Sequence, residues 1–86
     1  MTREEIFERL RSILVEEFSM EPGKIHPEAT LRGTLGMHSI QLVSLAVLLE
    51  DAYPEVAASG DDFDRYVGLA SVGDVVSFVM ERVQPS

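Results

Sequence analysis

The chain has 86 residues, which is enough for one small domain and too few for two. Seven Lys or Arg residues stand against fifteen Asp or Glu residues, so the net charge is −8. That charge disfavours a nucleic-acid partner, because affinity for phosphate backbones comes from Lys and Arg. It favours encounters with basic protein surfaces instead. The absence of cysteine excludes disulfides and thiolate metal sites.

The ends of the sequence give no sign of export or membrane insertion. The N-terminus lacks the basic and apolar regions of a secretory signal, and no apolar run is long enough to span a bilayer. We therefore expect a soluble, cytoplasmic protein, with a monomer as the default. A Met start and a polar end over 84–86 suggest a free-standing protein, although an excised domain would look much the same.

Helical periodicity begins near the N-terminus and predicts a helix over about 3–18. Thr2 is a good N-cap, and Glu5 completes a capping box. The apolar stripe that follows consists of Ile6, Phe7, Leu10, Ile13, Leu14 and Phe18. Residues 19–38 then form a long connection, which we expect to be fixed to the core by apolar residues that recur along it. These are Ile25, Ala29, Leu31 and Leu35. Such a tethered loop is often functional.

Three further helical segments are predicted. The first, over about 39–53, is apolar on most sides and is ended by Pro54, so it is either central or leaves an apolar face for a partner. A short helix over about 61–67 has Phe63 and Tyr66 as anchors. The last, over about 71–83, has Ser71 and Asp74 as its capping box. The prediction is a single all-α domain over 1–86, a small four-helix bundle with three main helices and one short one.

Metal sites are not expected. His26 and His38 lack the spacing of a metal-binding pair. The acidic residues Asp61, Asp62 and Asp64 lack the Gly and the terminal Glu that an EF-hand needs.

The adjacent pair His38-Ser39 raises the question of a hydrolase. Sequence neighbours at a helix start do not normally face each other as base and nucleophile, and there is no Gly-x-Ser-x-Gly elbow. Ser39 does lie where the long loop meets a helix N-terminus. Two interpretations stay open from the residues alone: a helix cap, or an attachment point for a phosphate, which a helix N-terminus favours.

A specific resemblance favours the second interpretation. The segment Leu35-Gly36-Met37-His38-Ser39-Ile40 is similar to the Leu-Gly-x-Asp/His-Ser-Leu/Ile signature of the acyl and peptidyl carrier proteins. The similarity extends over nearly the whole chain, including Thr30-Leu31-Arg32, Pro54 and the segment 69–74. It implies a bundle of the acyl-carrier type, with no catalytic residues.

The resemblance also implies a cofactor and partners. Ser39 would carry 4′-phosphopantetheine, transferred from coenzyme A by a phosphopantetheinyl transferase. The terminal thiol would hold an acyl or aminoacyl cargo as a thioester, so the sulfur missing from the chain would belong to the cofactor. A loading enzyme and downstream synthase or tailoring enzymes would be the other partners.

Two sets of residues are assigned roles by the same resemblance. Those expected to meet the transferase and partner enzymes are Met37, His38, Ile40, Gln41, Leu42 and Ser44. Those expected to shelter an apolar cargo, with plain core packing as the alternative, are Leu42, Ala46, Leu49, Tyr66 and Leu69.

The sequence departs from the pattern of fatty-acid carriers beside the serine. Those carriers usually have Asp before the serine and acids along the exposed second helix, whereas this chain has His38, Gln41 and Ser44. His before the serine is familiar in peptidyl carriers of nonribosomal synthesis. We therefore expect a discrete carrier of a polyketide or nonribosomal peptide pathway. The alternatives are a housekeeping fatty-acid carrier and an unmodified acidic adaptor.

Overall fold

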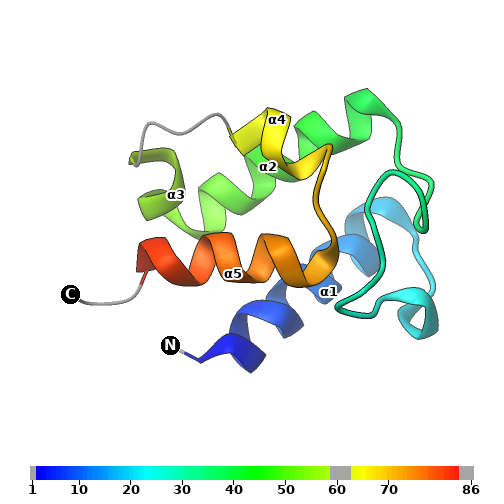
Figure 1. Ribbon diagram of the computed structural model, residues 1–86, viewed down its shortest axis with the longest axis horizontal. Helices are drawn as coiled ribbons and strands as arrows, with labels where there is room; N and C mark the ends of the chain where they lie inside the picture. The colour runs from blue at the N-terminus through cyan, green and yellow to red at the C-terminus, as the bar shows by residue number, and fades with distance from the viewer. Residues whose placement is uncertain (1, 59–62, 84–86) are drawn as a thin grey trace.

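The computed structural model describes residues 2–58 and 63–83, and for Asp64 the backbone alone. The α-helices within these ranges are α1 (Arg3–Phe18), α2 (Ser39–Ala52), α3 (Pro54–Ala58), α4 (Phe63–Val67) and α5 (Val72–Val83). Figure 1 shows α1 running obliquely behind α5, with α2 above both helices in this view and α4 against α2. The predicted all-α bundle is confirmed. Within the described ranges, none of the helices has both the length and the apolar character needed to cross a membrane.

The capping boxes expected for the first and last helices are present. The amide of Glu5 donates to Thr2 Oγ1 at 3.2 Å, and the Thr2 amide donates to Glu5 Oε1 at 3.3 Å. At the start of α5 the amide of Asp74 donates to Ser71 Oγ, and the Ser71 amide donates to Asp74 Oδ2, both at 3.1 Å. Each pair satisfies backbone donors that a helix start leaves without intrahelical partners.

The long connection over 19–38 is fixed to the core as expected. It contains a short 3-10 turn, Pro22–Lys24, and then runs beside the start of α5. The Leu31 amide donates to the Ala70 carbonyl at 3.2 Å, and the Val72 amide donates to the Ala29 carbonyl at 2.8 Å. Leu31 is fully buried. The backbone contacts and the buried Leu31 side chain therefore attach this segment to the core.

The end of α2 differs from the prediction. Pro54 does stop α2, which ends at Ala52, but it also begins the short helix α3. Proline is well suited to a first helical position, because its fixed φ is helical and its missing amide proton has no partner there. The other short helix begins at Phe63; residues 61 and 62 of the predicted span lie outside the described residues.

The core lies where the helices meet. Helix α1 contributes Ile6, Leu10 and Leu14, and α2 contributes Leu42, Leu45, Ala46 and Leu49. Phe63 of α4 stacks on Phe78 of α5, with ring centroids 4.9 Å apart, and the Tyr66 ring packs against Phe78 at a tilt, with centroids 4.5 Å apart. The Arg82 guanidinium covers the Phe78 ring. The two predicted anchors of the short helix therefore connect α4 to α5.

Candidate functional site

Ser39 is the first helical residue of α2, and its side chain is exposed. The N-cap position belongs to His38, whose amide donates to Gln41 Oε1 at 2.9 Å. His38 and Gln41 thus cap the start of α2, and the Ser39 hydroxyl is not needed for capping. An exposed hydroxyl at the start of a helix is accessible to a modifying enzyme.

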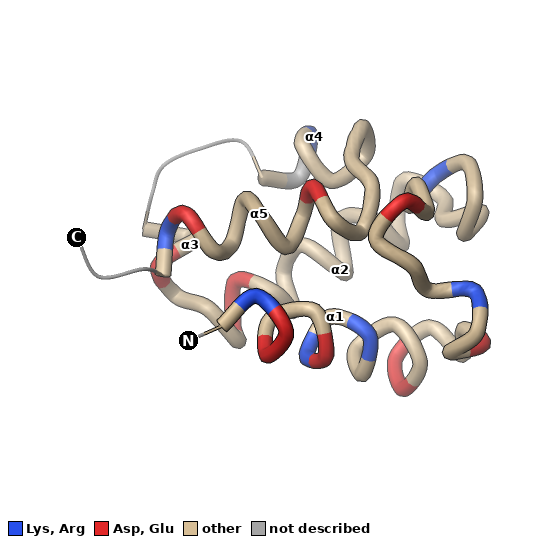
Figure 2. The backbone as a smooth tube through the Cα atoms, turned by 60° about the horizontal axis from the view of Figure 1, so that its bottom comes forward, with Lys and Arg blue, Asp and Glu red and all other residues tan. Residues whose placement is uncertain are grey.

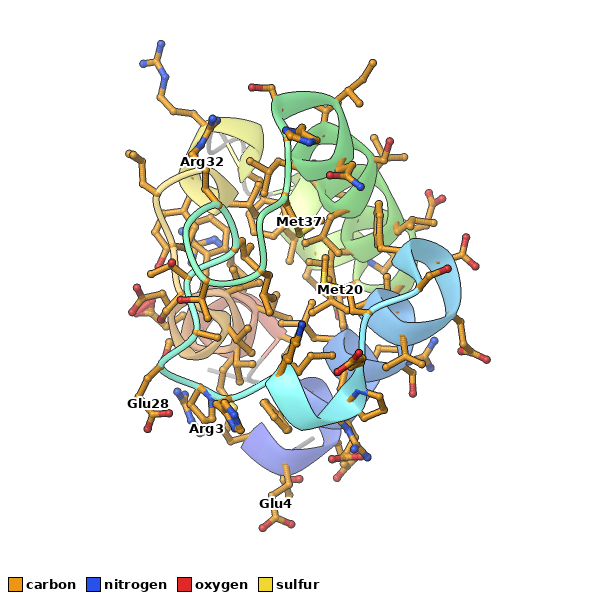
Figure 3. The ribbon with its side chains drawn as sticks, turned by 90° about the vertical axis from the view of Figure 1, so that its right-hand side faces the viewer. Arg3, Glu4, Met20, Glu28, Arg32 and Met37 are labelled. Atoms are coloured by element: carbon orange, nitrogen blue, oxygen red, sulfur yellow. The ribbon has the colours of Figure 1, made fainter. Side chains whose placement is uncertain are left out.

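The neighbour of the Ser39 hydroxyl is an arginine from the long loop. Arg32 Nη2 lies 3.4 Å from Ser39 Oγ, at hydrogen-bonding distance. Figure 3 shows the Arg32 side chain extending from the loop toward α4. A guanidinium keeps its proton at any physiological pH, so Arg32 cannot act as the general base that a serine hydrolase needs. It can pair with an anion attached to Ser39.

A cavity of about 620 Å³ opens beside Ser39. Its lining residues are Arg32, Ser39, Leu42, Val43, Arg65, Gly68 and Leu69. They come from the long loop, from α2, from α4 and from the segment after α4. The cavity therefore combines one hydroxyl, two cationic groups and an apolar wall.

The residues expected to meet partner enzymes are not all on the surface. His38, Ile40 and Ser44 are exposed, and 79% of Ile40 is accessible. Met37 and Leu42 are each only 2% exposed and belong to the core. This corrects the expectation for both residues, since the turn before α2 directs Met37 inward and Leu42 lies on the buried side of α2. Gln41 is half-buried and occupied in the helix cap, and the Ser44 hydroxyl donates to the Ile40 carbonyl at 3.1 Å.

The five residues expected to shelter cargo do not line one space. Leu42 and Leu69 border the cavity beside Ser39, and Leu69 is 85% exposed. Ala46 and Leu49 are fully buried and pack in the core. The Tyr66 hydroxyl donates to the Asp74 carbonyl at 3.1 Å, and burial, aided by the charges of Asp74 and Glu81, raises the pKa of Tyr66. For Ala46, Leu49 and Tyr66 the structure favours core packing, the alternative left open above.

Two residues of the exposed face were missed by sequence reasoning. Val43 and Val47 are about half exposed and continue from Ile40 along α2, forming an apolar stripe of Ile40, Val43 and Val47. Figure 2 shows charges along α1, whereas most of α2 carries none. The missed signal was the spacing of Ser44 and Asp51, seven residues apart, which marks the outward side of this helix.

The residues around Ser39 fit a 4′-phosphopantetheine group. The hydroxyl is accessible, the neighbouring guanidiniums suit a phosphate, and the apolar wall suits the methyl-bearing part of the arm. Within the described part of the chain, no group of three or more His, Asp or Glu side chains is arranged to hold a metal ion.

Comparison with known proteins gives the family. Residues 8–79 match the family described as "Phosphopantetheine attachment site". The chain is 34% identical over 83 residues to a protein named acyl carrier protein from Prochlorococcus marinus (strain MIT 9515), covering 92% of this chain and 94% of that protein. No solved structure matches the chain. The chain therefore belongs to the phosphopantetheine-binding acyl carrier protein family, whose members are carriers with a 4′-phosphopantetheine prosthetic group and not enzymes.

Proposed function

We propose that Ser39 is the attachment point of the prosthetic group and that the chain is a discrete carrier of a polyketide or nonribosomal peptide pathway. The observation that supports the attachment point is the exposed Ser39 hydroxyl at the first position of α2, beside a cavity with two arginines. The arm, when bound, supplies a terminal thiol that holds the cargo as a thioester.

The residues of the chain define what a transferase must provide. Ser39 Oγ would form a bond to the pyrophosphate phosphorus of coenzyme A that bears the pantetheine. The bond from that phosphorus to the bridging oxygen would break, and adenosine 3′,5′-bisphosphate would leave with that oxygen. The hydroxyl proton has to leave with help from the transferase, because the neighbouring Arg32 cannot accept it. The Arg32 side chain can instead pair with the phosphate that becomes attached to Ser39.

Partner enzymes are proposed to dock on the exposed side of α2. The part of this side nearest Ser39 offers His38 and the apolar stripe, while the acids Glu50 and Asp51 lie at the far end of the helix. A basic partner would find no carboxylate within the first turns of α2. This supports a specialised pathway over a housekeeping fatty-acid carrier, whose docking helix is expected to be acidic.

The attachment site is tested by mass spectrometry of the purified chain. After incubation with coenzyme A, magnesium and a broad-specificity phosphopantetheinyl transferase, we expect the intact mass to increase by one phosphopantetheine. Peptide fragmentation should place the added mass on Ser39. No gain with several such transferases would instead indicate an unmodified adaptor, and a gain on another residue would refute the assignment of Ser39.

The pathway is tested by giving the chain the missing carboxylate. His38→Asp should speed loading by a transferase of fatty-acid metabolism about twofold to fivefold in kcat/KM, which corresponds to one exposed ion pair. Asp is also a good N-cap, so α2 should stay intact. His26→Asp in the exposed loop is the matched control, with the same change of charge away from Ser39. Equal or slower loading of His38→Asp would contradict the argument that the missing acid restricts recognition.

A further inference from the structure

We propose that Arg32 and Arg65 bind the phosphate of the arm and hold the adjoining part of the arm in the cavity between α2 and α4. This inference rests on the proposed function, because it requires that Ser39 be modified. It adds a binding site for the arm on the surface of the domain itself, so that the arm lies against the protein next to its attachment point.

The charged side chains that line the cavity are both cationic, whereas the chain as a whole is acidic. The chain has only seven Lys or Arg residues and a net charge of −8, yet two of these seven line the cavity beside Ser39. None of the lining residues, all of which belong to the described part of the chain, is acidic. A recess lined by two guanidiniums and apolar side chains favours an anion.

Arg32 lies where a phosphate on Ser39 would meet it. Its Nη2 atom is 3.4 Å from Ser39 Oγ. The same atom would lie 3.7 Å from a Cβ atom placed on Gly68, so the guanidinium lies between the serine and the segment after α4. In a phosphate ester of Ser39, Oγ and the other phosphate oxygens are bonded to the same phosphorus atom. Those oxygens would therefore lie within reach of this guanidinium. Charge-assisted contacts of arginine with phosphate are roughly twice as strong as neutral hydrogen bonds.

The position of Arg32 is held by the backbone of the loop. The residue before it, Leu31, is fully buried, and the Leu31 carbonyl accepts from the Met37 amide at 3.0 Å. The loop therefore closes on itself between Arg32 and Ser39, and these contacts hold the backbone of the two residues close together. The exposed Arg32 side chain is then the part that must become ordered when it binds the phosphate.

The apolar wall of the cavity suits the part of the arm that follows the phosphate. In 4′-phosphopantetheine this part carries two methyl groups on one carbon. Leu42, Val43 and Leu69 line the cavity next to the arginines, and Val43 and Leu69 are 46% and 85% exposed. Covering Val43 and Leu69 would remove apolar surface from water, which is favourable. The absence of a side chain at Gly68 leaves room between Arg32 and Leu42.

The test compares amide NMR spectra of the chain before and after loading, with loading verified by intact mass. In the wild type we expect shifts at Gly68 and Leu69, far in sequence from Ser39, as well as at its neighbours. In fully loaded Arg32→Gln the shifts at Gly68 and Leu69 should largely disappear, and in Arg65→Gln they should decrease. Arg9→Gln, an exposed arginine of α1, is the matched control and should retain them.

The possible results separate this inference from the proposed function. A wild-type chain that gains no mass would overturn both. A chain that loads fully, but whose shifts stop at the neighbours of Ser39, would overturn the arm-binding site alone, as would unchanged shifts in Arg32→Gln.

Discussion

Ser39→Ala is expected to abolish loading completely, so that the intact mass stays that of the unmodified chain under conditions in which the wild type is converted. Alanine removes the nucleophilic oxygen and leaves the backbone of α2 unchanged. The lost contact is a 3.4 Å hydrogen bond to an exposed arginine, and His38 and Gln41 still cap the helix. The free energy of unfolding should therefore change by no more than about 0.5 kcal/mol.

Ser44→Ala provides the matched control for this experiment. Ser44 is also an exposed serine of α2, but it lies in the middle of the helix and not at its start. Its hydroxyl donates to the Ile40 carbonyl. Loading of Ser44→Ala should still proceed to completion, because the Ser39 hydroxyl is retained. If Ser39→Ala still gained a phosphopantetheine while remaining folded, Ser39 would not be the attachment point.

Leu31→Ala should lower the free energy of unfolding by about 2–5 kcal/mol, as expected for a leucine in a helical core. The residue lies in a segment without regular structure, yet its side chain is completely buried and its backbone pairs with Ala70 and Met37. Truncation would leave a cavity that these neighbours cannot close without breaking the backbone contacts. Denaturant unfolding followed by circular dichroism would measure the effect.

The comparison for Leu31 is Ile40→Ala, an aliphatic truncation next to Ser39. Because Ile40 is 79% exposed, the free energy of unfolding of this variant should differ from that of the wild type by no more than about 0.5 kcal/mol. A loss below about 1 kcal/mol in Leu31→Ala would show that the loop is only loosely attached to the core, since deleting a buried leucine normally costs more.

Most of the helical framework could be predicted because its signals are local. Capping boxes at Thr2 and Ser71 give the starts of α1 and α5, and the apolar periodicity gives their buried faces. The choice of Ser39 as the candidate attachment point came from the short motif over 35–40. Helix α3 was missed because Pro54 was interpreted as a stop signal, although proline is compatible with both the end of one helix and the start of the next.

The arrangement around Ser39 depends on contacts that sequence periodicity does not report. Arg32 belongs to a loop and Arg65 to α4, and only the folding of the loop against α5 brings them to one cavity. Met37 was expected on the surface because it adjoins Ser39, but neighbours along a chain turn in different directions outside regular structure. Nine of the fourteen residues of α2 are apolar, and they occur on both sides of the helix, so composition alone did not separate the buried side from the exposed stripe.

The pairing of Thr30 with Ser71 has a consequence for protein engineering. This pairing attaches the loop that precedes Ser39 to the start of α5, although Ser39 and Ser71 are more than thirty positions apart in sequence. A carrier domain of this kind moved into another protein must therefore keep the start of α5, even though that helix contributes no lining residue to the cavity. Junctions chosen only to preserve the serine motif and α2 would remove the support on which the loop rests.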